Sequence, residues 1–519
     1  VRIVAQNTEA LGATCGITGI PHPTSVGGVK FGFDPMPYYY LTLLACVLAI
    51  AMVVRLNRSR VGRGWVAVRE DEDAAELMGV PTFKFKLWAF AIGASTGGLA
   101  GWIYASKVSF ISPDNFPFFL SVLILAAVVL GGMGSIPGVI AGAFLIAFLP
   151  EYLRNVPAGE TILEGLNTIT GGEVANVVEY RVFLFGLALV VTMVFRPQGL
   201  LPSRQRAAEL SEATSDAQSL GVTPQVEEVA PSELQSEGEA TTSVPEDVEL
   251  PSDLVERAAE VADIALQVQD LTMEFGGVTA LSQVSLNVPR GQIFGIIGPN
   301  GAGKTTLFNC VTGVFRPTSG TIVLDGQEVI GRKPHKITVA GVARTFQNIR
   351  LFANMSAMEN VLVGTDARHT SSVPGALAYT PKHRREERLA REEALRLLEF
   401  VGISHRREEL ARNLPYGDQR RLEIARALAT QPKVLLLDEP AAGFNPAEKR
   451  ALMTLIREIR DQGLTVILIE HDMGLVMETC DRIAVLDFGE KIAEGAPAEI
   501  QRDPRVIAAY LGVPADAAS

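Results

Sequence analysis

The sequence predicts two folded parts, an α-helical membrane domain and an α/β domain that binds phosphate groups, joined by an acidic linker. Three observations predict this organisation. Apolar runs recur between residues 38 and 195, residues 207–256 hold thirteen acids and no base, and a complete G-x-x-x-x-G-K-[ST] motif begins at Gly298. A chain of 519 residues is long enough for two or more domains. We place the boundaries at residues 1–202, 203–262 and 263–519.

Five apolar runs predict the membrane domain. They cover Tyr38–Val54, Leu87–Ala105, Pro117–Leu130, Ile136–Pro150 and Tyr180–Phe195. One such run would also fit a core helix of a soluble protein, but five with almost no internal charge favour membrane spans. The third and fourth runs are short, so they form either two short spans or a re-entrant hairpin packed inside protein. Residues 1–36, rich in Gly, Pro and Thr, are expected to be loop.

Basic residues predict the orientation of these spans. One group lies between the first two runs and another follows the last run: Arg55, Arg58, Arg60, Arg63, Arg69, Lys84 and Lys86, then Arg196, Arg204 and Arg206. Basic loops mark the cytoplasmic side of a membrane. This assignment puts residues 1–37 outside with no span before them, and we expect that upstream helices are missing from this chain.

The charge balance and the cysteines indicate neither nucleic acid nor zinc. The formal net charge of −12 arises from the acidic run Ala207–Glu256, and the remainder is near neutral. The run also lacks aromatic residues, so we expect it to be disordered. About fifty such residues span roughly 40 Å on average, enough to tether one domain to another. Four scattered cysteines without a C-x-x-C pair predict no disulfide framework and no zinc site.

The glycine-rich motif is the most specific signal. A short apolar strand is predicted at Ile293–Ile297, directly before the motif. Glycines let the backbone curl so that several N–H groups point at one anion, and the helix starting near Lys304 adds its positive end. A glycine-rich turn that binds nothing is the alternative. We expect a nucleotide to be bound by Gly298, Asn300, Gly301, Gly303, Lys304, Thr305 and Thr306, with Lys304 on the β- and γ-phosphates and the Thr305 hydroxyl on Mg²⁺.

The segment between the first two apolar runs carries a second signal. A helix-like stretch, Glu70–Met78, ends at Gly79 and fits a solvated connector or a docking helix equally well. With ISPDNF (Ile111–Phe116) and GGMGSIPGVIAGA (Gly131–Ala143), the segment resembles the permease of branched-chain amino acid ABC transporters. The resemblance runs from about residue 55 to Pro202. It implies that the Glu70–Gly79 helix couples the permease to its ATPase.

Residues 265–512 resemble ABC ATPases, which implies an α/β core with a helical subdomain in residues 353–412. Phe275 matches the aromatic residue that stacks on adenine, although a core role fits it equally well. Gln347 in GVARTFQ matches the Q-loop glutamine, which contacts Mg²⁺ or the attacking water. His471 after the strand Val466–Ile469 matches the switch histidine that contacts the γ-phosphate.

Asn413–Ala429 resembles the ABC signature, whose usual form is L-S-G-G-Q. The resemblance implies that this segment contacts ATP held by an opposite ATPase domain. Pro415 stands where serine is usual, which removes one hydroxyl donor to that nucleotide, while backbone N–H groups and the helix start can still serve. The residues expected to make the contact are Tyr416, Gly417 and Asp418.

The apolar strand VLLLDE (Val434–Glu439) ends in two acids. Asp438 is expected to hold Mg²⁺ and Glu439 to polarise the attacking water. The expected catalytic set is therefore Glu439, His471, Gln347 and Lys304, and the expected metal set is Thr305, Asp438 and Gln347. Asn445 falls in the D-loop region, where it replaces the usual acid.

Together the resemblances imply a permease–ATPase fusion subunit of an ABC importer for branched-chain amino acids, multi-pass in the cell membrane with its ATPase in the cytoplasm. The implied ligands are ATP and Mg²⁺. The implied partners are a second permease and ATPase, or a second copy of this chain, and an extracytoplasmic binding protein, with no nucleic acid. Urea or short amides are the close alternative substrates. A soluble-type ABC ATPase acting on nucleic acid or translation, and a regulatory subunit with a dead ATPase, are the alternatives from other classes.

Overall fold

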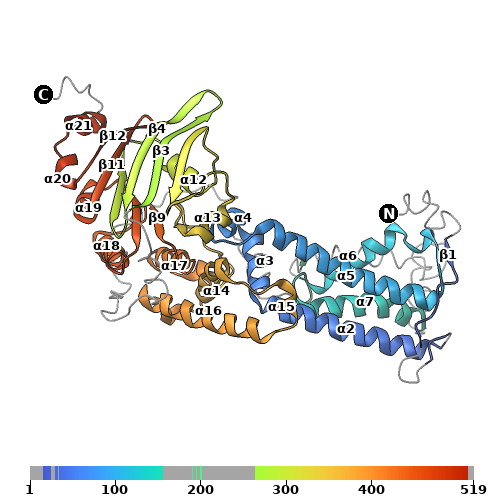
Figure 1. The fold of residues 1–519 in the computed structure, drawn as a ribbon. Helices are drawn as coiled ribbons and strands as arrows, with labels where there is room; N and C mark the ends of the chain where they lie inside the picture. Colours follow the sequence, from blue (N-terminus) through green and yellow to red (C-terminus); the bar gives the residue numbers. More distant parts are fainter. Residues whose placement is uncertain are drawn as a thin grey trace, which may run out of the picture. The chain divides into compact units, whose positions relative to one another are not determined.

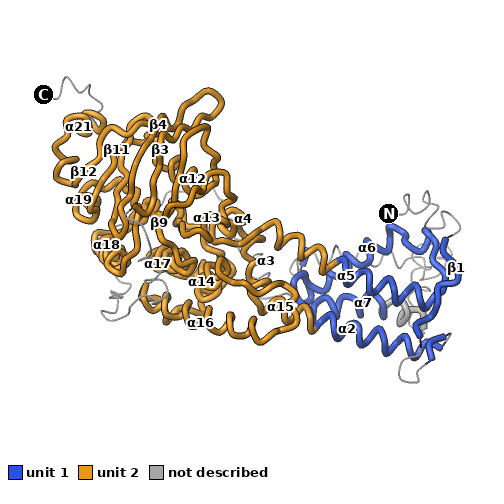
Figure 2. Tube along the Cα trace, in the orientation of Figure 1, with its two compact units in different colours: residues 1–50, 94–237 blue, residues 51–93, 238–519 orange. Residues whose placement is uncertain are grey.

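A computed structural model of the chain describes residues 16–24, 30–32, 34–155, 190, 194–195, 199–201 and 264–511. The predicted linker and most of the fifth apolar run lie outside the described residues. The chain divides into two compact units, residues 1–50 with 94–237 and residues 51–93 with 238–519 (Figure 2). The segment between the first two apolar runs therefore belongs to the same unit as the C-terminal part.

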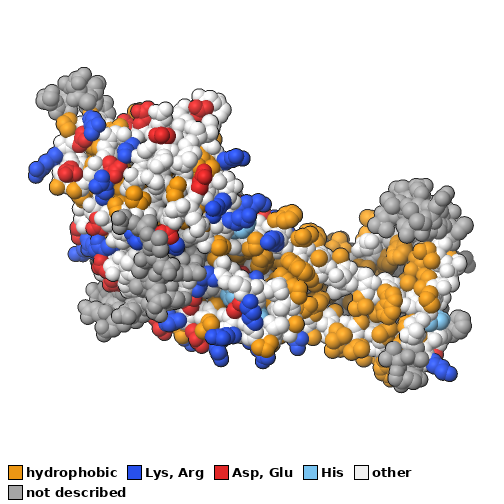
Figure 3. All heavy atoms as spheres, viewed as in Figure 1, with side chains coloured by type: hydrophobic (Ala, Val, Ile, Leu, Met, Phe, Trp, Pro, Cys, Tyr) orange, Lys and Arg blue, Asp and Glu red, His pale blue; other side chains and the backbone are white. Residues whose placement is uncertain are grey.

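The first unit consists of helices over the predicted apolar runs. α2 (Pro35–Asn57) and α5 (Thr82–Val108) begin or end in this unit, and α6 (Phe118–Gly131) and α7 (Ile136–Asn155) lie within it. Among the described residues, Pro35–Asn57 and Pro113–Gly131 are long and apolar enough to cross a membrane, and Ile136–Phe148 is a shorter apolar helix. Apolar side chains cover the outer surface of these helices (Figure 3), as expected for a surface that faces lipid.

One expectation for this unit needs correction, because residues 1–36 are not all loop. Ile17–Thr18 forms strand β1, which pairs antiparallel with β2 (Phe110–Ile111) beyond the end of α5. The pairing satisfies main-chain groups that a free segment would leave to water. A two-residue strand has too little sequence to be recognised by alternation alone.

The second unit is built on two sheets (Figure 1). A six-stranded sheet has the order β12-β11-β5-β10-β9-β8 and is parallel except at β12. Its strands are β5 (Ile293–Ile297), β8 (Val342–Arg344), β9 (Val434–Asp438), β10 (Thr465–Ile469), β11 (Arg482–Asp487) and β12 (Glu490–Gly495). An antiparallel sheet of order β4-β3-β6-β7 comprises β3 (Ile264–Phe275), β4 (Val278–Pro289), β6 (Ser319–Leu324) and β7 (Gln327–Glu328).

The three central strands β5, β10 and β9 are buried along their whole length, which explains their mostly apolar sequences. In β9, Val434 and Leu436 enter the core that contains α12, while Leu435 and Leu437 enter the core that contains α17. The helices that follow β5 along the chain are α12 (Lys304–Val311), α13 (Pro334–Ala340), α14 (Ala357–Gly364), α15 (Val373–Leu377), α16 (Pro381–Phe400), α17 (Tyr416–Leu428), α18 (Pro446–Asp461), α19 (Met473–Thr479), α20 (Pro497–Ile500) and α21 (Pro504–Leu511).

The segment between α2 and α5 forms two short helices, α3 (Arg60–Glu70) and α4 (Glu72–Leu77). The predicted helix Glu70–Met78 is therefore shorter at both ends, because Glu70 belongs to α3 and α4 ends at Leu77. Asp71 adopts an extended backbone and its carboxylate accepts a hydrogen bond from the Ala74 amide at 2.9 Å, so it caps α4. We call residues 58–81 the docking loop.

Glycines set the packing distance between α6 and α7. A methyl group at Gly142 would lie 2.1 Å from the Ala127 carbonyl oxygen, whereas one at Gly98 on α5 would meet nothing within 4 Å. We predict that Gly142→Ala lowers the free energy of unfolding by about 1–3 kcal/mol through overpacking, and so lowers the thermal unfolding midpoint of the purified protein. Gly98→Ala is the matched control and should leave the midpoint unchanged or slightly higher, because alanine favours helix. Equal midpoints for the two variants would contradict this packing.

Candidate active site

The phosphate-binding motif forms a loop between β5 and α12 that only glycine permits at two points. Gly298 has φ of +151° and a Cβ there would lie 2.1 Å from the Leu486 carbonyl oxygen. Gly303 has φ of +96° and a Cβ there would lie 2.6 Å from the Ala280 carbonyl oxygen. The tight turn brings the amides of this segment and the start of α12 together, which is the arrangement that binds phosphate groups.

Lys304 lies inside this loop rather than in solvent. Its ammonium donates to the carbonyl oxygens of Gly298 at 2.7 Å and Pro299 at 2.9 Å. Burial lowers the pKa of Lys304, and the charges of Glu439 and Asp438 oppose that shift. The side chain predicted to bind the phosphates, Lys304, therefore already lies in the phosphate-binding loop.

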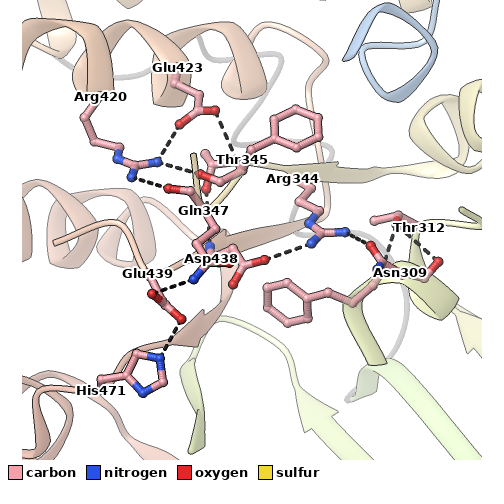
Figure 4. A network of polar contacts seen from close by, with 12 residues as sticks. Asn309, Thr312, Arg344, Thr345, Gln347, Arg420, Glu423, Asp438, Glu439 and His471 are labelled. Atoms are coloured by element: carbon pink, nitrogen blue, oxygen red, sulfur yellow. Dashed lines mark hydrogen bonds and ion pairs between the residues drawn. The ribbon is translucent and has the colours of Figure 1, made fainter. Parts of the chain in front are cut away.

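Asp438 ends β9 with a side chain that has no exposed surface. One carboxylate oxygen accepts a hydrogen bond from Arg344 at 2.8 Å, and the other has no hydrogen-bond partner among the described residues (Figure 4). Burial raises the pKa of Asp438, and the Arg344 guanidinium opposes this shift. Arg344 also donates to the Asn309 side chain at 2.6 Å, so it links β9 to α12.

Three of the predicted catalytic side chains form a connected set (Figure 4). Glu439 has φ of +47°, and its amide donates to the Ile469 carbonyl at 2.9 Å. The Gln347 amide group donates to one Glu439 oxygen at 3.0 Å, and His471 Nε2 lies 2.6 Å from the other. Because a carboxylate accepts only, His471 Nε2 carries the proton of this hydrogen bond.

The predicted metal residues line one cavity. A space of about 530 Å³ is bordered by Thr305, Gln347 and Asp438, and also by Asp73, Glu76 and Leu77 of the docking loop. Across the described ranges, no group of three or more His, Cys, Asp or Glu side chains could hold a metal ion. One buried carboxylate with an unused oxygen, a hydroxyl and an amide oxygen fit a hard cation that takes its other ligands from phosphate and water.

The remaining predicted binding residues lie outside this set. Tyr416, Gly417 and Asp418 begin α17 and do not border the cavity. The Tyr416 hydroxyl donates to the Ala442 carbonyl at 3.1 Å, and Asp418 pairs with Arg406 at 3.1 Å. Phe275 is 43% exposed at the end of β3, with its ring 5.2 Å from that of Phe315, so it has a free face. Asn300 is exposed and Thr306 is half-buried, on either side of Thr305, whose exposed side chain borders the cavity.

The sequence analysis did not predict the buried charged side chains beside the site, which are Arg344 and the pair Arg420 and Glu423. Arg344 was hidden because an arginine that ends a short strand reads as an ordinary surface residue, and only its place three residues before Gln347 gave a signal. The buried pair Arg420 and Glu423 was hidden in the charged run RRLE. Their spacing of three residues on a helix was the available sign of an ion pair.

The docking loop contacts the nucleotide-binding part through its second helix. His335 on α13 lies 3.0 Å from the Glu76 carboxylate, and the Thr338 hydroxyl donates to the Leu77 carbonyl at 2.9 Å. An apolar cluster joins the two segments, with Ala74, Ala75, Leu77 and Met78 from the loop packed in the same cluster as Phe346, Phe352 and Met355. Phe346 directly precedes Gln347, so the loop packs beside the catalytic set.

A buried ion pair forms a second contact through α3. Arg63 donates to both Glu387 oxygens at 3.1 and 3.0 Å, and the Arg60 amide donates to the same carboxylate at 2.8 Å. The two side chains are only 6% and 13% exposed. Burial acts to raise the pKa of Glu387, but the charge and hydrogen bonds of Arg63, with the Arg60 amide, hold it below its usual value. Glu387 lies on α16, so this ion pair joins α3 to α16.

The fold and the grouped site define an ATPase of the ABC class. Family models match in three places: "ABC transporter" over residues 281–442, "Branched-chain amino acid transport system / permease component" over residues 2–193, and "Branched-chain amino acid ATP-binding cassette transporter" over residues 490–516. A solved nucleotide-free ATP-binding cassette from an ABC transporter is 31% identical, with a TM-score of 0.42, and covers 48% of this chain and 98% of that chain.

Curated relatives identify the branch of this class. The chain is 50% identical over 248 residues to the high-affinity branched-chain amino acid transport ATP-binding protein BraF of Pseudomonas aeruginosa. It is 48% identical over 248 residues to LivG of Escherichia coli, of the same description. Each match covers 48% of this chain and 97% of the relative. The chain belongs to the branched-chain amino acid ABC transporter family, as a permease region fused to an ATP-binding region.

Arg344 is predicted to stabilise the protein mainly when nucleotide is absent. Arg344→Ala leaves the buried Asp438 carboxylate without its positive partner, at a cost on the order of 3–5 kcal/mol. The thermal unfolding midpoint should therefore fall without ligand and recover largely when MgATP is added. Arg290→Ala, which breaks a pair with Asp325 remote from Asp438, is the control and should show no such ligand-dependent recovery. An equal loss with and without MgATP would contradict the assignment.

The Arg63–Glu387 pair is predicted to be required for coupling. Glu387→Arg places two like charges in a buried site and should reduce amino-acid-stimulated ATP hydrolysis severalfold, with basal hydrolysis retained. The exchange Arg63→Glu with Glu387→Arg should restore part of the stimulation. Glu392→Arg on the same helix, where the side chain is 58% exposed, is the control. A double variant no better than the single variant would exclude direct pairing as the basis of the defect.

Proposed function

We propose that this chain couples ATP hydrolysis to uptake of branched-chain amino acids across the cell membrane. The observation that carries the proposal is the cavity shared by Thr305, Gln347 and Asp438 with Asp73, Glu76 and Leu77 of the docking loop. A change at the phosphates therefore alters the surroundings of the permease segment directly, which is what a transport ATPase requires.

Within one site, the contacts support the following proposed roles. Lys304 moves its ammonium from the Gly298 and Pro299 carbonyls to the β- and γ-phosphates of ATP. Glu439, held between Gln347 and His471, orients and deprotonates the attacking water, and His471 faces the γ-phosphate. Phe275 offers its free face to adenine. Thr305, Asp438 and Gln347 would hold Mg²⁺, which when bound neutralises developing charge on the phosphates.

The complete transporter is proposed to contain two ATPase domains that enclose two ATP molecules. Tyr416, Gly417 and Asp418 lie apart from the cavity of their own domain, and Tyr416 is 47% exposed, which leaves the start of α17 open to an opposite domain although Asp418 pairs with Arg406. The second half is a companion permease and ATPase or a second copy of this chain. The amides at the start of α17 replace the donor that Pro415 removes.

The proposed placement is a multi-pass membrane protein with the ATPase in the cytoplasm. Two observations support a cytoplasmic docking loop: the basic residues around it, and its location in the same unit as the ATPase. Residues before α2 then face the outside, where an extracytoplasmic binding protein delivers the substrate. We place the domain boundaries at residues 1–202, 203–262 and 263–519, while noting that residues 51–93 fold onto the ATPase.

The test is ATP hydrolysis by the complex reconstituted in lipid with its binding protein, across leucine, isoleucine, valine, urea and acetamide. We predict stimulation by the branched-chain amino acids alone. Glu439→Gln should abolish hydrolysis with ATP binding retained, because it removes the base and leaves the phosphate loop intact. Stimulation by urea or acetamide alone would change the proposed substrate class to urea or short amides. Hydrolysis at the same rate with every ligand would overturn the transport proposal.

A further inference from the structure

Helix α17 carries an ion pair that is fully withdrawn from solvent. The side chains of Arg420 and Glu423 have exposures of 0% and 1%, and their charged groups lie 2.8 Å apart. Two charges are costly to bury unless further hydrogen bonds satisfy them. Here those further hydrogen bonds go to a different segment of the chain.

The pair holds the backbone on both sides of the peptide that leads into Gln347 (Figure 4). Arg420 donates to the Phe346 carbonyl at 2.7 Å and to the Gln347 carbonyl at 3.0 Å. Glu423 accepts from the Phe346 amide at 3.1 Å. Three main-chain groups of two consecutive residues are thus bound by one rigid guanidinium and one carboxylate.

This backbone carries the side chain that holds Glu439, the proposed catalytic base. Gln347 donates to Glu439 at 3.0 Å, and no other side-chain donor but His471 contacts Glu439 among the described residues. A catalytic group displaced by about 1 Å can lose on the order of a hundredfold in rate. The position of the Gln347 backbone is therefore a determinant of the reaction, and α17 fixes it.

We propose that Arg420 and Glu423 are positioning residues that tie Gln347 to α17, so that Gln347 follows any movement of this helix. The proposal rests on the proposed function, because α17 begins with Tyr416, Gly417 and Asp418, the residues assigned to the opposite nucleotide. The short span from Tyr416 to Arg420 is one turn of helix. Engagement of ATP at the start of α17 in one domain is then transmitted to the hydrolytic centre of the same domain.

The test uses Arg420→Lys in the full-length reconstituted complex. Lysine keeps a positive charge beside Glu423 but lacks the planar fork that reaches two carbonyl groups. Hydrogen exchange of the Phe346 amide, which donates to Glu423, should accelerate by about fivefold, because this segment opens more readily once a carbonyl group of residues 346–347 loses its donor, the equivalent of one hydrogen bond. The kcat for ATP hydrolysis should fall about tenfold, with KM for ATP unchanged, because the phosphate loop and Phe275 are untouched.

The matched control is Arg421→Lys, at the next position of the same helix. Arg421 donates to the Val401 carbonyl at 3.2 Å, so this hydrogen bond holds a different segment from the one that contains Phe346 and Gln347. This variant should leave kcat, KM and the exchange of residues 346–347 unchanged. It reports on the general cost of replacing an arginine on α17.

A double-mutant cycle with Gln347→Ala separates positioning from general destabilisation. If Arg420 acts through Gln347, Arg420→Lys should reduce kcat less than twofold further in the Gln347→Ala background. Additive losses, a raised KM, or unchanged exchange at Phe346 would overturn the proposal. These readouts need no transported substrate, so failure of amino acids to stimulate hydrolysis would count against the proposed function alone. If the wild type shows no hydrolysis, the exchange measurement still decides whether Arg420 holds this backbone.

Discussion

The parallel sheet imposes the constraint on which this site depends, because parallel strands end at the same edge. β5, β9 and β10 are neighbours in register, so the phosphate loop, Asp438 with Glu439, and Glu470 with His471 follow from one edge. β8 extends the same edge and delivers Arg344 and then Gln347. Strand pairing alone brings distant residues together, since Ile296 of β5 pairs with Ile469 of β10, 173 positions later in the chain.

Burial of charge at this edge gives the site its rigidity. Asp438 is paired with Arg344, and Glu470 accepts hydrogen bonds from the amides of Ala441 at 2.7 Å and His471 at 3.3 Å. Burial raises the pKa of both carboxyl groups, since each is desolvated more than its partners compensate. Such groups are held in single positions because any displacement leaves a buried charge without its hydrogen bonds. The phosphate loop, by contrast, holds Lys304 only through two carbonyl groups that a stronger acceptor can replace.

The sequence was sufficient for the parts of this arrangement that motifs define. The strand before Gly298, the Asp438–Glu439 pair and the helices over four of the five apolar runs were predicted from local patterns, and the family membership was confirmed. Arg344, Arg420 and Glu423 were missed because their partners lie on other segments, and a pairing between distant segments leaves no local periodicity. The ion pair of Arg63 and Glu387, 324 positions apart, was beyond reach for the same reason. The assigned roles of the nucleotide-binding residues remain proposals.

Buried charges of the ATPase lie close enough to the docking loop to interact with its Asp71 carboxylate. α17 directs Arg420, Glu423 and Arg426 into the core at intervals of three residues, which leaves one excess positive charge. The Arg426 guanidinium makes no hydrogen bond among the described residues and lies 4.8 Å from the centre of the Phe352 ring. Burial lowers its pKa to about 10, while the charges of Glu423 and Asp71 act in the opposite direction. Asp71 also caps α4 and pairs with Arg350 at 3.4 Å, so one carboxylate of the docking loop both begins this helix and contacts a cation of the ATPase. The loop and the catalytic domain therefore share one electrostatic balance, and a shift of either changes the energy of the other.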